Sequence, residues 1–126
     1  MMTREEGEKT YFLPFNLDFP NPVNPNGHKT AYMWEDILLP DTLLDLINNY
    51  LHLQKKSEKL YDEKKDKVTE KESEIFIFPR FHQLDVVRKL LDAVRKDGMG
   101  NSYLIQHSAG SGKSNSIAWT AHQLAS

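Results

Sequence analysis

The sequence predicts an α/β fold in its second half, and three consecutive segments carry that prediction. The apolar run Tyr103-Leu104-Ile105-Gln106 has the length and composition of a buried strand. A loop rich in glycine and serine, HSAGSGKS, follows at residues 107–114. A helix is expected from about Gly112 onward, over SNSIAWTAHQLA. A strand, a tight loop and a helix in this order form the unit from which parallel α/β sheets are built.

The composition excludes several classes of function. The chain has 126 residues, a net charge of −2 and no cysteine, so neither disulfides nor thiolate metal sites are expected. Its five histidines never fall three to five residues apart, which leaves a helical zinc pair unsupported. No segment is long and apolar enough to cross a bilayer or to act as a signal peptide, so we expect no membrane contact and a cytoplasmic location.

Three regions are expected along the chain. Residues 1–54 contain the loop NPVNPNG, whose prolines and glycine exclude regular structure, and then a helix with Asp41 as its N-cap. The apolar positions of that helix, at helical spacing, are Leu43, Ile47, Tyr50 and Leu51. Residues 55–74 mix seven lysines with seven acids, which predicts a solvated helix extension or a flexible linker. Residues 75–126 hold the strand–loop–helix unit.

A second helix is predicted over Phe81–Asp97. It follows the short apolar run Ile75–Phe78, which Pro79 closes. Arg95 and Lys96 lie in its last turn, and Gly98 and Gly100 are expected to end it. One apolar stripe is expected at Leu84, Val87, Leu91 and Val94.

The loop has the residues that bind the phosphates of a nucleotide. Main-chain N–H groups at a helix N-terminus bind anions, and Gly110 and Gly112 allow the backbone to wrap closely around them. Lys113 would reach the β- and γ-phosphates, and the Ser114 hydroxyl would coordinate Mg²⁺. The strict pattern has glycine six residues before the lysine, where this chain has His107. The alternative is a Gly/Ser-rich loop that happens to contain a lysine.

Gln83 gives the second indication of nucleotide binding. It lies near the start of the preceding helix, thirty residues before Lys113. A carboxamide can pair with both N6 and N7 of adenine, so a glutamine placed here would select ATP over GTP.

The combination of Arg80-Phe81-His82-Gln83 with AGSGKS resembles the start of a superfamily 2 helicase or translocase motor, which has a RecA-like fold. FPRFHQLDVVRKLL and NSYLIQHSAGSGKSNSIAWTAHQLA are similar to the R (restriction) subunit of type I restriction-modification enzymes. YFLPFN, the NPNG loop and KTAYMWEDIL resemble the segment of that subunit between nuclease and motor. The resemblance covers most of the chain, and the family's loop also begins with QHSAGSGKS.

The resemblance implies an α/β fold: the start of a RecA-like P-loop motor domain, preceded by a mixed loop and helix segment. It implies that residues 1–54 end the nuclease domain and connect it to the motor, that 55–74 form a charged linker, and that 75–126 begin the ATPase. The whole protein would hydrolyse ATP to translocate double-stranded DNA and cleave unmodified DNA, in complex with methylation (M) and specificity (S) subunits.

The resemblance also assigns roles to single residues. Gln83 would contact adenine, with Arg80 and Phe81 lining its pocket, while Lys113 would bind phosphate and Ser114 would bind Mg²⁺. The phosphate cradle would consist of Ala109, Gly110, Ser111 and Gly112.

No complete catalytic centre is expected within the 126 residues. The family's Glu-x-Lys nuclease strand would lie upstream, and its acidic Mg²⁺ motif and arginine finger downstream. We therefore expect a fragment that is inactive alone. Two alternatives stay open: a fragment of another superfamily 2 DNA translocase or helicase, and an inactive remnant that serves at most in interactions.

Overall fold

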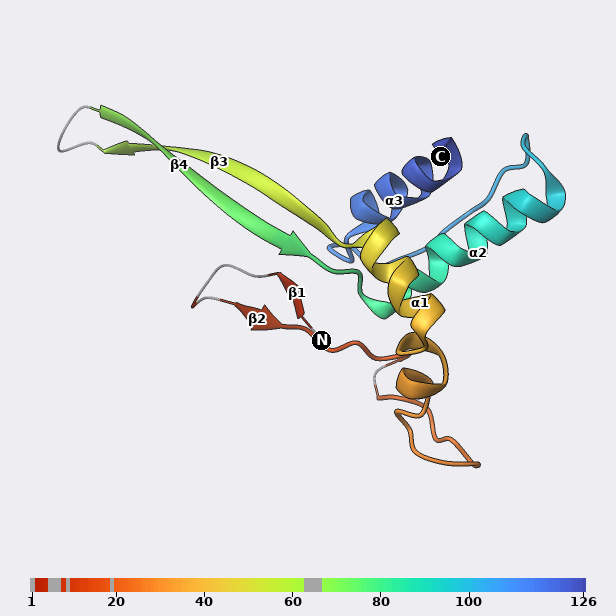
Figure 1. Ribbon diagram of the computed structural model, residues 1–126. Coiled ribbons are helices and arrows are strands. Elements are labelled where there is room, and N and C mark those ends of the chain that lie inside the picture. Colours follow the sequence, from red (N-terminus) through yellow and green to blue (C-terminus); the bar gives the residue numbers. More distant parts are fainter. Residues whose placement is uncertain (1, 5–7, 9, 19, 63–66) are drawn as a thin grey trace.

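The computed structural model describes residues 2–4, 8, 10–18, 20–62 and 67–126. Figure 1 shows the helices gathered together, with a long arm formed by β3 (His52–Asp62) and β4 (Lys67–Ile77) that projects from them. At the N-terminus, β1 (Met2–Arg4) pairs antiparallel with β2 (Tyr11–Phe12). The NPVNPNG loop follows without a helix or strand, as the sequence predicts, and the Asn24 side chain closes a turn by accepting from the Asn26 amide at 3.0 Å.

The predicted first helix is present but is built differently. It consists of the π-helical turns η1 (Met33–Ile37) and η2 (Leu46–Tyr50) on either side of α1 (Pro40–Asp45). Asp41 is not the N-cap, so that prediction was wrong. Leu39 takes this position because a residue before proline favours an extended backbone (φ −62°, ψ 143°), and Pro40 then opens the helix.

The apolar face of this helix also differs from the predicted one. Tyr50 is buried as predicted and Leu51 is half-buried, but Leu43 and Ile47 are 38% and 52% exposed, and Leu46 is buried instead. The cause is the wider turn at η2, where the Leu51 amide donates to the Leu46 carbonyl five residues back and so rotates the face that meets the core.

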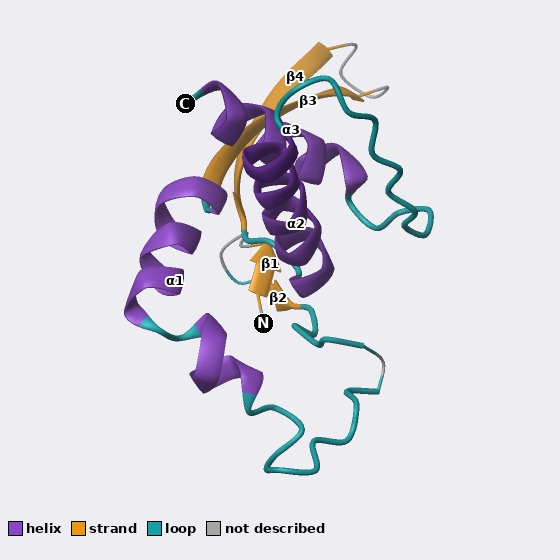
Figure 2. Cartoon of the chain, turned by 90° about the vertical axis from the view of Figure 1, so that its right-hand side faces the viewer, coloured by secondary structure: helices purple, strands orange, loops and turns teal. Residues whose placement is uncertain are grey.

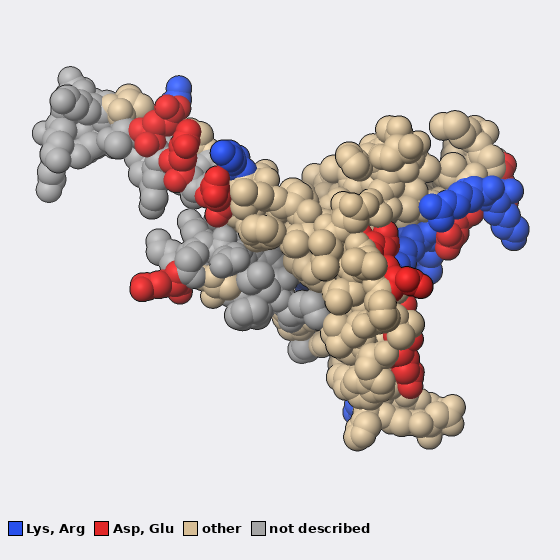
Figure 3. Space-filling model, in the orientation of Figure 1, with Lys and Arg blue, Asp and Glu red and all other residues tan. Residues whose placement is uncertain are grey.

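The charged segment 55–74 is neither helix nor irregular linker. It lies within an antiparallel hairpin of β3 (His52–Asp62) and β4 (Lys67–Ile77). In this register Lys55 faces Glu74 and Lys59 faces Glu70, with N–O distances of 3.5 and 4.0 Å. The mixed charges of this segment thus lie opposite one another on two paired strands. These exposed ion pairs stabilise the strand pairing slightly. Figure 3 shows both signs of charge on this arm, and basic side chains over α2.

The helix α2 (Phe81–Asp97) has the bounds and the stripe that the sequence predicts. Leu84, Val87 and Leu91 are buried and Val94 is half-buried, and Arg95 and Lys96 lie in the last turn. Gly98 ends the helix with φ 77°, a conformation that L side chains rarely adopt.

The strand predicted at Tyr103–Gln106 is absent from the structure, so that prediction was wrong. Residues 101–108 are irregular and run beside α2 and α3, and Leu104 is 96% exposed. A strand of a parallel sheet needs hydrogen-bonded neighbours, and the described residues pair only as two separate antiparallel two-stranded sheets. The RecA-like α/β fold class therefore stays a prediction. The last helix, α3 (Lys113–Ala125), begins within one residue of the predicted position.

One core joins both ends of the chain. Figure 2 shows α2 and α3 side by side, and the segment of η1, α1 and η2 packs against them. The N-terminal region of residues 1–54 and the region 75–126 therefore share a single hydrophobic cluster rather than forming separate cores. Its buried members are Phe15, Ile37, Leu46, Tyr50, Leu84, Val86, Val87, Leu91 and Trp119.

Candidate phosphate-binding site

The loop between residue 107 and α3 is shaped by two glycines. Gly110 and Gly112 have φ angles of 74° and 79°, in the left-handed region where a Cβ is unfavourable. The Ser111 amide closes a turn by donating to the Ser108 carbonyl at 3.3 Å. Gly112 is the N-cap of α3. The backbone thus reverses tightly at the helix start, as a phosphate loop requires.

The first amides of α3 are free to bind an anion. Within the described part of the chain, the N–H groups of Gly112, Lys113 and Ser114 donate no hydrogen bond to another backbone group. Helix geometry leaves such donors without intrahelical partners, and the helix dipole adds positive potential at the same place. Three adjacent donors therefore stand at the position where the sequence predicts the phosphate groups.

Gln83 is placed beneath this loop. Its side chain is 4% exposed, its Nε2 donates to the Gly112 carbonyl at 2.9 Å, and its Oε1 accepts from the Arg80 amide at 2.9 Å. A Cβ at Gly112 would collide with Gln83 Nε2. The carboxamide that we expect to read adenine is therefore bonded within the chain, where it joins the start of α2 to the loop.

His82 is a loop contact that the sequence interpretation missed. Its Nε2 lies 2.9 Å from the Ser111 carbonyl oxygen. The ring of His82 also meets the ring of His107 edge to face, with centroids 5.1 Å apart. The position of His82, next to Gln83 at the start of α2, is the signal that could have indicated this role.

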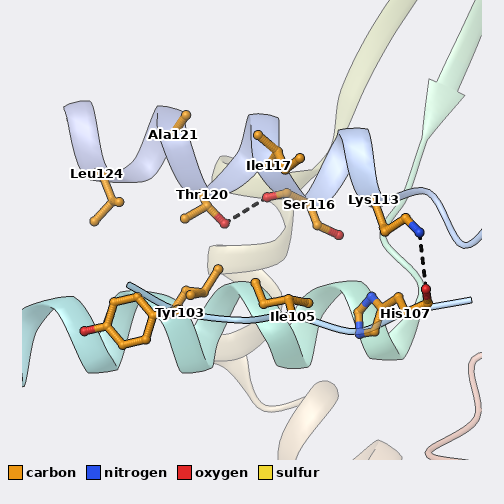
Figure 4. Close-up of a pocket in the computed structure, with 10 residues that line it drawn as sticks. Tyr103, Ile105, His107, Lys113, Ser116, Ile117, Thr120, Ala121 and Leu124 are labelled. Carbon is orange, nitrogen blue, oxygen red and sulfur yellow. Dashed lines mark hydrogen bonds between the residues drawn. The ribbon is translucent and has the colours of Figure 1, made fainter. Parts of the chain in front are cut away.

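Lys113 folds back over the loop. Its ammonium group is exposed and donates to the His107 carbonyl at 3.2 Å, so it spans the whole loop (Figure 4). The carbonyl is a neutral acceptor, and a phosphate oxygen would be a stronger, charge-assisted partner for the same group.

The two serines of the loop differ. Ser114 is exposed, so its hydroxyl could coordinate a cation bound to phosphate, whereas Ser111 is 8% exposed and its hydroxyl has no partner among the described residues. The described residues contain no cluster of three or more His, Asp or Glu that could hold a metal. Ser114 would thus supply one Mg²⁺ ligand, with phosphate oxygens and water supplying the rest.

Phe81 and Arg80, the residues predicted to line an adenine pocket, make contacts within the chain. The Phe81 ring packs edge to face on Phe15 and on Tyr32, at centroid distances of 5.7 Å in both cases. Phe81 therefore belongs to the aromatic border of the core, while Arg80 directs its main-chain amide to Gln83.

An apolar cavity of about 390 Å³ opens beside the loop, between α3 and residues 103–107 (Figure 4). Tyr103, Ile105 and His107 point into it from one side, and Ile117 and Thr120 line the other. Lys113 and Ser116 border the end nearest the loop. An apolar cavity therefore lies next to the candidate phosphate site.

Of the predicted site residues, Gln83 and the segment from Ala109 to Ser114 come together at the junction of α2 and α3, whereas the half-buried Phe81 packs against the core. In the part of the chain that the structure describes, none of the helices has the length and apolar character needed to span a membrane. Comparisons of the chain with protein-family models, with curated proteins and with solved structures gave no match.

Proposed function

We propose that the loop of residues 107–114 binds the β- and γ-phosphates of ATP. The observation that carries this proposal is a row of three main-chain amides, those of Gly112, Lys113 and Ser114, which donate to no backbone carbonyl of the described residues. They stand at a helix start where Gly110 and Gly112 have positive φ angles. Charge-assisted hydrogen bonds from such donors are strong, and Lys113 adds a positive charge over the same loop.

The wider proposal is that the chain belongs to the R subunit of a type I restriction-modification enzyme. ATP hydrolysis would then drive translocation of double-stranded DNA before cleavage, together with methylation and specificity subunits. The sequence resemblance in AGSGKS, Arg80-Phe81-His82-Gln83 and the N-terminal segments supports this role. In it, Ser114 would hold Mg²⁺ and Lys113 would offset the charge that develops on the transferred phosphoryl group.

A structural loop without a ligand is the competing proposal, and one contact favours it. The Gln83 carboxamide, which would read adenine, already donates to Gly112 and accepts from Arg80. If the loop were only a connection between α2 and α3, the role of Gln83 would be to stabilise that connection. The two proposals differ in whether Lys113 and the free amides have affinity for a polyphosphate.

Titration of the 126-residue chain with ATP and Mg²⁺ by calorimetry tests the proposal. We expect saturable binding that Lys113→Ala weakens about tenfold or more, because the phosphates lose their charged partner. Lys96→Ala, which removes an exposed lysine from the end of α2, is the matched control and should bind as the unaltered chain does. Absence of binding, or equal affinities of the two variants, would contradict phosphate recognition by this loop.

The adenine assignment has a separate test. Gln83→Ala should reduce the affinity for ATP more than the affinity for GTP, because only adenine pairs with a carboxamide at N6 and N7. A parallel loss for both nucleotides would show that Gln83 only supports the loop.

We expect negligible ATP turnover by the chain alone. Measurable ATP turnover that Lys113→Ala abolishes would show this prediction to be wrong.

A further inference from the structure

Two neighbouring residues at the start of α2 hold two neighbouring carbonyls of the loop. His82 Nε2 lies 2.9 Å from the Ser111 oxygen, and Gln83 Nε2 lies 2.9 Å from the Gly112 oxygen. A carbonyl only accepts, so His82 must carry its proton on Nε2 in this contact. The start of α2 therefore makes a pair of adjacent hydrogen bonds to the backbone of the loop.

These contacts determine where the loop amides point. In a planar trans peptide the C=O and the following N–H point in opposite directions. With the Ser111 carbonyl held toward His82, the Gly112 N–H points away from α2. The Gly112 carbonyl accepts from Gln83 and from the amides of Asn115 and Ser116 in α3, so the Lys113 N–H also points away from these donors. Both amides are among those that donate to no backbone carbonyl of the described residues.

We propose that His82 is a positioning residue for the phosphate loop, an inference that rests on the proposed function. Through its bond to Ser111 it fixes the peptide whose N–H would meet a phosphate oxygen, so the donors are oriented before a ligand arrives. Preorganised donors bind more tightly because less conformational entropy is lost on binding.

The ring of His82 contacts the first residue of the loop as well as Ser111. It packs on the His107 ring with an interplanar angle of 87°, and the His107 carbonyl in turn accepts from Lys113. His82 therefore contacts both His107, which precedes the glycines, and Ser111, which lies between Gly110 and Gly112. Loss of the ring and loss of the Nε2 donor are separable, because phenylalanine keeps an aromatic ring and glutamine keeps a side-chain N–H at a similar reach.

The test compares His82→Phe and His82→Gln in the full chain, with tripolyphosphate and adenosine as separate probes. We expect His82→Phe to weaken tripolyphosphate binding about fivefold, the effect of one hydrogen bond, and His82→Gln to restore affinity to within about twofold. Adenosine binding should be equal in all variants, since it does not use the loop. His122→Phe, which alters an exposed histidine on α3, is the control.

A readout without ligand separates this inference from the proposed function. Because Gly112 N–H shares a peptide with the Ser111 carbonyl, its amide resonance should shift in His82→Phe and return toward the original position in His82→Gln. If the unaltered chain ignores tripolyphosphate, the proposed function fails and the contact is only structural. If it binds, but His82→Phe binds equally well or His82→Gln is as weak as His82→Phe, only the positioning role of His82 is overturned.

Discussion

Trp119 Nε1 donates a hydrogen bond to the Tyr50 carbonyl at 2.9 Å, which joins residues that are 69 positions apart. Their rings also meet, with centroids 5.7 Å apart, and both side chains are almost fully buried. This pair fixes α3 to the end of η2, directly before the hairpin. The helix that begins at the candidate phosphate loop is therefore held by the N-terminal half of the chain.

Replacing Trp119 should destabilise the whole fold. Trp119→Phe removes the N–H group that donates to the Tyr50 carbonyl, and it creates a small cavity. We therefore expect the free energy of unfolding to fall by about 2 kcal/mol. Ile117→Ala, at a position of the same helix that is 70% exposed, should change stability by less than about 0.5 kcal/mol. Urea denaturation measures both, and equal effects would contradict the anchoring role of Trp119.

Stability should fall at high pH because of Tyr50. Burial raises the pKa of its hydroxyl above the usual 10.0. The folded chain then keeps a proton that the unfolded chain releases, so the contribution of Tyr50 is fully present below pH 10.0 and decreases as the pH rises toward the folded-state pKa. Thermal unfolding between pH 8 and 11 should show a steeper loss for the unaltered chain than for Tyr50→Phe. Parallel curves would show that Tyr50 does not titrate differently on folding.

Gly112 should tolerate alanine less well than Gly110. Both have positive φ angles, but an added Cβ has nothing within 4 Å at Gly110 and collides with Gln83 at Gly112. We expect Gly110→Ala to cost about 1 kcal/mol from backbone strain, and Gly112→Ala about 2 to 4 kcal/mol.

A double variant isolates the contact with Gln83. Combining Gly112→Ala with Gln83→Ala removes the colliding side chain, so the double change should cost less than the sum of the single ones. Additive costs measured by denaturation would mean that the Gly112 requirement comes from its φ angle alone.

Local signals in the sequence were sufficient for α2 and for the start of α3. The stripe of Leu84, Val87 and Leu91, with Gly98 behind it, predicts the helix and its end, because spacing and a glycine C-cap act within a few turns. Gly112 marks the beginning of α3 for the same reason. The loop of residues 107–114 was predicted from its glycines, both of which have positive φ angles.

The hairpin and the missing strand depended on pairing, which no local pattern contains. Lys55 and Lys59 lie in a strand because the backbone of β3 pairs with that of β4, whereas Tyr103–Gln106 has strand composition but no partner strand among the described residues. The π-turn at Leu46 likewise rotated a helix face whose predicted positions assumed regular spacing.

By itself, the sequence determined the helices with regular apolar spacing, the glycine-shaped loop and the side chains that could meet a phosphate, because each depends on neighbours along the chain. Only the tertiary structure decided that His82 and Gln83 hold the carbonyls of Ser111 and Gly112, and that Tyr50 secures α3 through Trp119. Those contacts join residues 29 and 69 positions apart, so they exist only once burial of the shared core has brought α2, α3 and η2 together.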